Sequence, residues 1–278
     1  MTRIPRLALV HAHPDDESLW TGGTIARYAA SGAEVMVITC TLGEEGEIIP
    51  DDLRQLRAQE ADQLGGYRIG ELRAALAALG VSRHAFLGGP GRWRDSGMVG
   101  DPANERPRAF VRGSIEEQAD TLVELLAEFQ PQVLVSYDAF GGYGHPDHIR
   151  AHQITVAAAP RLSTVERVFY AVQSARAIRD GIAELAQWTD QPFRLQTEDD
   201  LAVVNDDLIG TVVDIAAHVP AKLRALRAHA TQVSVWESGE RVVYALSNDI
   251  AAPVLPNEYF VLASGNADGA EHDLFGKG

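Results

Sequence analysis

The sequence has one cysteine, no long apolar run and a shortage of basic residues. A single thiol, Cys40, cannot form an intramolecular disulfide or a cysteine-rich zinc site, and we interpret it as a small buried residue. No run of about 18 apolar residues is present, so no membrane-spanning segment is expected. The N-terminus also lacks the apolar region and cleavage site of a secretory signal, so we expect a cytoplasmic protein.

Lys and Arg total 24 against 39 Asp and Glu, which gives a formal net charge of −15. Binding to phosphate-rich partners requires clustered positive charge, so neither a nucleic acid nor an anionic membrane is expected as the main partner. The chain is nevertheless 46% hydrophobic over 278 residues, which is enough to bury a core. Its length predicts one large domain, or a core with a smaller subdomain.

Short apolar runs alternate with helical patterns through the first half of the chain. Strands are expected at 7–10, 34–40, 84–87, 133–136 and 168–172, and helices at 24–30, 51–79 (broken at Gly65 and Gly66), 114–129 and 152–159. This alternation predicts an α/β fold with a mainly parallel sheet flanked by helices. Residues 1–175 would form the core and 176–265 a smaller α+β extension, with a helix near 214–230, extended pieces near 242–246 and 259–262, and a flexible tail over 266–278.

A dense polar cluster directly follows the first expected strand. The segment 11–17 reads HAHPDDE, with two imidazoles and three carboxylates. Loops after the carboxyl ends of parallel strands line the ligand crevice of such sheets, and His nitrogen and Asp oxygen are typical zinc ligands. Because His11 and His13 share a strand face by alternation, spacing does not decide which of them is the ligand.

A second cluster follows the strand expected at 133–136. The segment 141–148 reads GGYGHPDH, a glycine-rich turn leading into a helix. Two parallel strands with polar side chains at their carboxyl ends bring both clusters to one edge of the sheet. Together they predict a site that binds one divalent cation through His and Asp.

The segments AHPDDE (12–17) and HPDH (145–148) together resemble the PIG-L/LmbE family of zinc-dependent N-deacetylases. The resemblance implies a Rossmann-like core over about residues 5–173 with one zinc ion per chain. It implies His13, Asp16 and His148 as metal ligands and Asp15 as general base. Ferrous iron is an alternative to zinc, because His and Asp ligands suit both ions.

Further segments resemble the branch of this family that acts in mycothiol biosynthesis: 39–47, 63–72, 91–98 and 228–232. This resemblance implies removal of acetate from a sugar–inositol substrate, N-acetylglucosaminyl-inositol. Cleavage of mycothiol S-conjugates, or deacetylation of another N-acetylglucosamine derivative, is the alternative. Arg68 and Asp95 would contact substrate hydroxyls, Met98 would line the sugar pocket and Glu47 would reach the site from its loop.

Three residues of the second cluster are further catalytic candidates. His145, if protonated, would stabilise the oxyanion and Tyr143 would donate another hydrogen bond. Asp147 would orient His145 and raise its pKa. Packing beside the loop for Tyr143 and helix capping for Asp147 are the alternatives, and the remaining histidines are interpreted as structural or surface residues: His84, His152, His218 and His229.

Overall fold

The computed structural model describes residues 4–81 and 83–276. Its larger sheet has the strand order β3-β2-β1-β4-β5-β11-β7. The strands β1 to β5 are mutually parallel, whereas β11 runs antiparallel to both β5 and β7. These strands are β1 (Arg6–His11), β2 (Glu34–Thr39), β3 (Arg83–Phe86), β4 (Val133–Tyr137), β5 (Arg167–Val172), β7 (Thr211–Asp214) and β11 (Asn257–Gly265). The expected parallel α/β sheet is confirmed.

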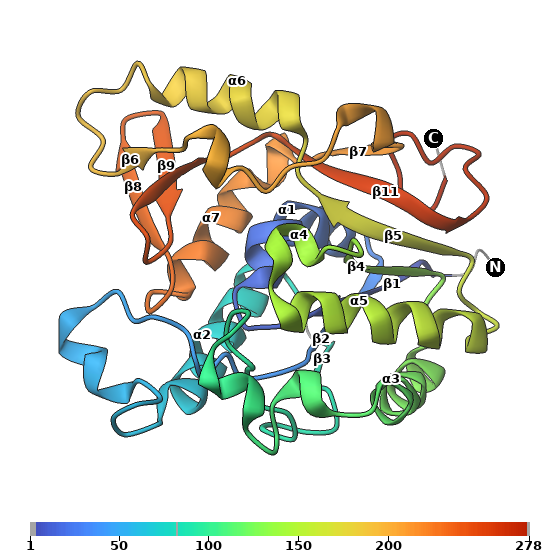
Figure 1. Cartoon of the computed structure of the whole chain (residues 1–278). Coiled ribbons are helices and arrows are strands. Elements are labelled where there is room, and N and C mark those ends of the chain that lie inside the picture. The colour runs from blue at the N-terminus through green and yellow to red at the C-terminus, as the bar shows by residue number, and fades with distance from the viewer. Residues whose placement is uncertain (1–3, 82, 277–278) are drawn as a thin grey trace.

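Helices cover both faces of this sheet (Figure 1). The α-helices are α1 (Asp16–Ala30), α2 (Leu64–Ala78), α3 (Ile115–Phe129), α4 (Gly141–Gly144), α5 (Pro146–Ala158), α6 (Ala175–Leu185) and α7 (Val219–Ala228). Short 3-10 helices lie at Asp51–Leu56, Pro102–Glu105, Phe110–Arg112, Ala159–Arg161, Glu198–Asp200, Asp206–Leu208 and Ala216–His218.

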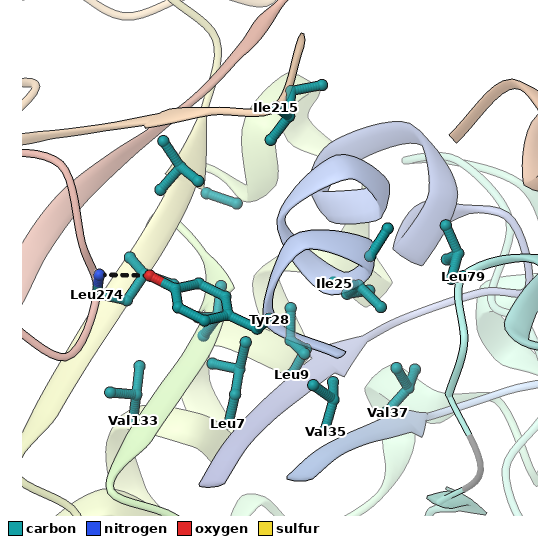
Figure 2. Close-up of a cluster of buried hydrophobic side chains, with 14 of the residues drawn as sticks. Leu7, Leu9, Ile25, Tyr28, Val35, Val37, Leu79, Val133, Ile215 and Leu274 are labelled. Carbon is teal, nitrogen blue, oxygen red and sulfur yellow. Dashed lines mark hydrogen bonds between the residues drawn. The ribbon is translucent and has the colours of Figure 1, made fainter. Parts of the chain in front are cut away.

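The alternation of side chains along β1 divides the apolar core between the two faces. Leu7 and Leu9 pack with α1 residues such as Ile25 and Tyr28 in the cluster of Figure 2. Ala8 and Val10 belong to the opposite cluster, together with apolar residues of α3 and α5. A central strand is therefore apolar on both faces, as expected for a parallel sheet covered by helices.

A smaller sheet follows in the C-terminal part of the chain. Its order is β6 (Arg194–Leu195), β10 (Ile250–Pro253), β9 (Arg241–Ala245) and β8 (Ser234–Ser238). Helix α6 packs on it through a small cluster built around Leu185, Val243 and Ala251. The extended piece expected near 242–246 is part of β9, and the one expected at 259–262 lies within β11.

The larger sheet crosses the expected boundary at residue 175, and described residues of the expected flexible tail pack on the core. The strands β7 and β11 complete the larger sheet, so it draws on both sides of that boundary. In the tail, Ala270 and Leu274 are buried, and the Leu274 N–H donates to the Tyr28 hydroxyl over 2.7 Å, the bond drawn in Figure 2. Apolar side chains in a mainly polar tail gave too weak a pattern to predict this packing.

Several element boundaries also differ from the sequence prediction. The helix expected over 51–79 is a 3-10 turn followed by α2, which runs through Gly65 and Gly66 instead of breaking there. A Cβ at Gly65 would lie 2.7 Å from Glu44 Cγ, so close packing of the 42–46 loop explains that glycine. The helices α1 and α5 begin earlier than expected, within the polar clusters, and the 214–230 helix is restricted to α7.

Candidate active site

Both polar clusters lie at the carboxyl ends of neighbouring parallel strands. Strand β1 ends at His11 and β4 at Tyr137, and the two are paired in the larger sheet. After β1 the chain turns into α1, with Asp15 at the N-cap. After β4 it passes through a turn of three glycines with positive φ into α5, which His145 caps. The site is therefore built from two segments about 130 residues apart in sequence.

His13, Asp16 and His148 come together at this edge. The Asp16 Oδ2 lies 3.5 Å from His13 Nδ1 and 3.3 Å from His148 Nε2. Burial opposes ionisation of Asp16, but the adjacent His148 and His13 outweigh it and hold the pKa of Asp16 well below its ordinary value. The three predicted ligands thus share one buried cluster.

The His148 ring is oriented by its surroundings. Its Nδ1 lies 3.1 Å from the Gly141 carbonyl oxygen, which requires the proton on Nδ1. The Tyr137 ring stacks on it with centroids 4.1 Å apart. The Nε2 atom of His148 is buried and makes no hydrogen bond with any described residue. In the neutral form of the ring this nitrogen carries the lone pair that a metal ligand offers, with Asp16 Oδ2 3.3 Å away.

The donor set fits a divalent cation. Ring nitrogens of His13, His145 and His148 lie within 4.8 Å of one another, and Asp16 adds a carboxylate. Around His13, the carboxylates of Asp95, Asp147 and Asp16 outweigh its burial and raise its pKa well above the ordinary value. A divalent cation would neutralise this surplus of buried negative charge, and two imidazoles with one carboxylate are a common protein ligand set for such ions.

The structure also distinguishes His11 from His13. His11 Nε2 lies 2.9 Å from Thr21 Oγ1, and its Nδ1 lies 3.3 Å from the Tyr137 hydroxyl. Both ring nitrogens of His11 are therefore occupied by protein partners. Burial lowers the pKa of His11 to about 4, which fits a neutral core residue. His13 is the histidine of this segment that faces the cluster.

Asp15 lies beside the cluster in a constrained position. Its φ of 118° is uncommon for a residue other than glycine. Its N–H donates to Glu17 Oε2 over 3.0 Å, and its Oδ2 lies 3.0 Å from Arg68 Nη2. Burial raises the pKa of Asp15 to about 6, although the Arg68 charge opposes the shift. A carboxylate titrating near neutrality suits a general base.

The contacts of His145 and Asp147 differ from the expected ones. The Asp147 carboxylate lies 3.2 Å from His13 Nε2 and accepts the Ser96 N–H over 2.9 Å. His145 is held instead by the backbone, because its Nδ1 accepts the Asp147 N–H over 3.1 Å. Burial and the neighbouring His13 and His148 lower the pKa of His145 to about 3 rather than raising it. His145 is thus a neutral ring with Nε2 as its N–H donor.

Tyr143 lies over these histidines with its side chain partly in solvent. Its ring centroid is 4.9 Å from that of His148 and 5.9 Å from that of His145. Tyr143 is 43% exposed as a residue, although burial raises the pKa of its hydroxyl. Met98 is likewise exposed, at 48%, and Glu47 is exposed.

Arg68 and Asp95 are buried among protein partners. Arg68 is 2% exposed and donates to the backbone oxygens of Gly43 and Pro14. Asp95 accepts the N–H groups of Gly97 and Glu45 and lies 3.5 Å from His13 Nε2. Both side chains are therefore held by protein groups within the site, with Asp95 beside His13 and Arg68 beside Asp15.

A buried pair behind Asp15 went unrecognised in the sequence. His229 Nε2 lies 2.7 Å from Glu17 Oε1, and both side chains are fully buried. His229 is thus structural, as expected, but it supports the carboxylate that receives the Asp15 N–H. The similarity of segment 228–232 to relatives was the available signal, and it did not reveal this contact. Cys40 is buried, and burial raises the pKa of its thiol, as expected for a packing residue.

Comparison with known families decides where this architecture belongs. The model of the PIG-L family, described as GlcNAc-PI de-N-acetylase, matches residues 8–159. The chain belongs to the PIG-L family. The matched range covers both polar clusters and the strands β1 to β4, apart from the first two residues of β1, and it ends before β5.

PIG-L relatives extend over the whole chain. A 1D-myo-inositol 2-acetamido-2-deoxy-alpha-D-glucopyranoside deacetylase from Actinosynnema mirum is 65% identical over 277 residues, covering 99% of this chain and 98% of the relative. An enzyme of the same name, numbered 1, from Saccharopolyspora erythraea is 58% identical and covers 99% and 95%.

Solved structures share the fold at lower identity. The N,N'-diacetylchitobiose deacetylase from Pyrococcus horikoshii has a TM-score of 0.53 at 20% identity, covering 81% of this chain and 70% of that one. The 4-carboxy-2-hydroxymuconate hydratase GalB from Pseudomonas putida has a TM-score of 0.58 at 15% identity, covering 95% and 98%. A hydratase and a deacetylase thus share this fold, so chemistry must be argued from the site. Among the described residues, no helix has the length and apolar character to cross a membrane.

Proposed function

We propose that this chain is a zinc-dependent N-deacetylase that removes acetate from N-acetylglucosaminyl-inositol in mycothiol biosynthesis, leaving glucosaminyl-inositol. The observation that carries the proposal is the buried His13, Asp16 and His148 cluster with Asp15 beside it. The full-length relatives named as deacetylases of this sugar–inositol support the substrate.

In this proposal His13, Asp16 and His148 hold one zinc ion. When bound, the ion lowers the pKa of water and polarises the amide carbonyl. Tyr137 and the Gly141 carbonyl keep His148 in its ligating orientation, and Asp147 does the same for His13 through Nε2. Such outer partners fix the ligand tautomers.

Asp15 acts as the general base. It accepts a proton from the attacking water and delivers one to the amine nitrogen as the carbon–nitrogen bond breaks, so amide and water become acetate and ammonium. Its pKa of about 6 leaves it mostly ionised at neutral pH and still able to carry a proton transiently. Arg68 and the Glu17 carboxylate hold it in place.

His145 and Tyr143 stabilise the oxyanion of the tetrahedral intermediate. His145 does so as a neutral N–H donor, since its Nδ1 is occupied by the Asp147 N–H. The Tyr143 hydroxyl adds a second donor. We expect the exposed Met98 and Glu47 to contact the sugar–inositol, and the buried Arg68 and Asp95 to hold Asp15 and His13 in place.

The test is acetate release from N-acetylglucosaminyl-inositol by metal-stripped protein reloaded with one ion at a time. Zinc is expected to restore turnover, and ferrous iron in an anaerobic sample tests the alternative metal. A mycothiol S-conjugate is assayed in parallel. Absence of acetate release with every ion refutes the deacetylase assignment, and a higher kcat/KM for the conjugate reverses the substrate assignment.

A further inference from the structure

The middle of helix α1 is hydrogen-bonded to side chains from outside the helix. In a regular α-helix the Gly23 N–H bonds to the Leu19 carbonyl. Here the Gly23 and Thr24 N–H groups donate to the two Glu258 carboxylate oxygens, over 2.9 and 2.8 Å. The Leu19 carbonyl accepts a bond from Lys222 Nζ over 2.9 Å.

Lys222 and Glu258 form a buried ion pair across this point. Their Nζ and Oε1 atoms are 2.7 Å apart, and the side chains are 9% and 4% exposed. Lys222 comes from α7, which packs beside α1, and Glu258 comes from β11 (Figure 1). The ion pair therefore bonds to the Gly23 N–H and to the Leu19 carbonyl, two backbone groups one helical turn apart in α1.

The sequence of α1 accommodates this approach. A Cβ at Gly22 would lie 3.3 Å from Lys222 Cγ, and one at Gly23 would lie 2.5 Å from Ile215 Cδ1. Two adjacent glycines are unfavourable inside a helix, by about 1 kcal/mol each relative to alanine. Their presence here matches the close contact with the C-terminal part of the chain.

The Leu19–Gly23 step of α1 separates the residues near the site from the residues in the apolar core. Before it lie Asp16 and Glu17, which belong to the site, and within it lies Trp20, whose ring centroid is 6.5 Å from that of His148. After it, Ile25 and Tyr28 pack in the apolar core. Displacing the ion pair would allow the first part to shift relative to the second.

We propose that Lys222 and Glu258 are positioning residues that set the first turn of α1, and with it the placement of Asp16 for metal binding. The inference rests on the proposed function. It assigns Lys222 and Glu258, from the C-terminal part of the chain, a role in assembling a site whose proposed ligands all lie within the first 148 residues.

The experiment measures metal affinity alongside stability. Purified Glu258→Gln and Lys222→Met variants are titrated with zinc against a chromogenic chelator and melted with and without the ion. The matched control is Tyr28→Phe, which removes a buried bond between the far end of α1 and the C-terminal segment, the bond to the Leu274 N–H. Both positioning variants are expected to bind zinc about tenfold or more weakly, the scale typical of outer-shell groups.

The control separates positioning from general stabilisation. Tyr28→Phe is expected to melt at a lower temperature and to bind zinc as the wild type does. Lys222→Arg, which retains the charge, is expected to recover part of the affinity lost in Lys222→Met. Wild-type zinc affinity in both positioning variants overturns the inference, as does an equal loss in Tyr28→Phe.

The two hypotheses fail in different ways. If the wild-type protein binds no divalent ion, the proposed function fails. If the wild type binds zinc and the variants bind it equally well, the positioning role alone fails. If Glu258→Gln does not fold, Lys222→Met with its Lys222→Arg partner decides the question.

Discussion

Replacing Arg68 with methionine distinguishes a positioning role from a substrate-binding role for this arginine. Its guanidinium contacts the backbone oxygens of Gly43 and Pro14 and the Asp15 carboxylate. Methionine fills much of the same space without any donor. The change leaves a buried carboxylate without its charge partner.

The expected loss of stability follows from that burial. The Arg68 and Asp15 side chains are 3% and 13% exposed, and removing one partner of a buried ion pair costs about 3–5 kcal/mol. Unfolding entropy of about 2.1 cal/mol/K per residue gives about 0.6 kcal/mol/K for a chain of this length. The melting temperature should therefore fall by about 5–9 °C, measured by calorimetry.

Kinetics decide between the two roles. Displacing a catalytic group by about 1 Å can cost about 10²-fold, so kcat should fall by roughly that factor with KM little changed. Arg73→Met is the matched control, because Arg73 lies on the same helix and is exposed. Arg68→Lys should fall between wild type and Arg68→Met. A large rise in KM with kcat intact would show that Arg68 binds substrate, and would refute the positioning argument.

Three further predictions concern the metal and its base. Asp15→Ala should retain its zinc by elemental analysis while turnover falls about 10²–10⁴-fold, and wild-type turnover would remove Asp15 from the role of base. Gly141→Ala should weaken zinc binding in a chelator titration, because φ at Gly141 is +68° and a Cβ there would lie 2.7 Å from His148 Cβ. The control Gly210→Ala, which has open space around it, should bind zinc as the wild type does, and equal affinities in the two variants would contradict the argument. Thermal melts with and without chelator should show that zinc at 100 times its Kd stabilises the wild type by about 2.7 kcal/mol. His148→Ala should show no such stabilisation. The same stabilisation in that variant would exclude His148 as a ligand.

Local sequence patterns were enough to predict much of the fold and the outline of the site. The apolar runs at β1, β2, β4 and β5 are short, and helical patterns separate them, so the parallel sheet could be predicted. Ser114 caps α3 through the Glu117 N–H, as its capping pattern indicated. The start of α1 was missed because the acidic cluster hid a helix N-terminus, and the place of β11 was missed because its partners lie far away in sequence.

The sequence by itself determined the chemistry of the site: which donors follow the strands, and that two clusters meet where neighbouring parallel strands end. The tertiary structure decided which atoms meet. In the tertiary structure His13 rather than His11 lies in the cluster, the Asp147 carboxylate contacts His13, and Arg68 is buried against Asp15. The fold also brings Glu258 to Gly23 across 235 residues of chain. Such contacts depend on packing between distant segments, which no local spacing encodes.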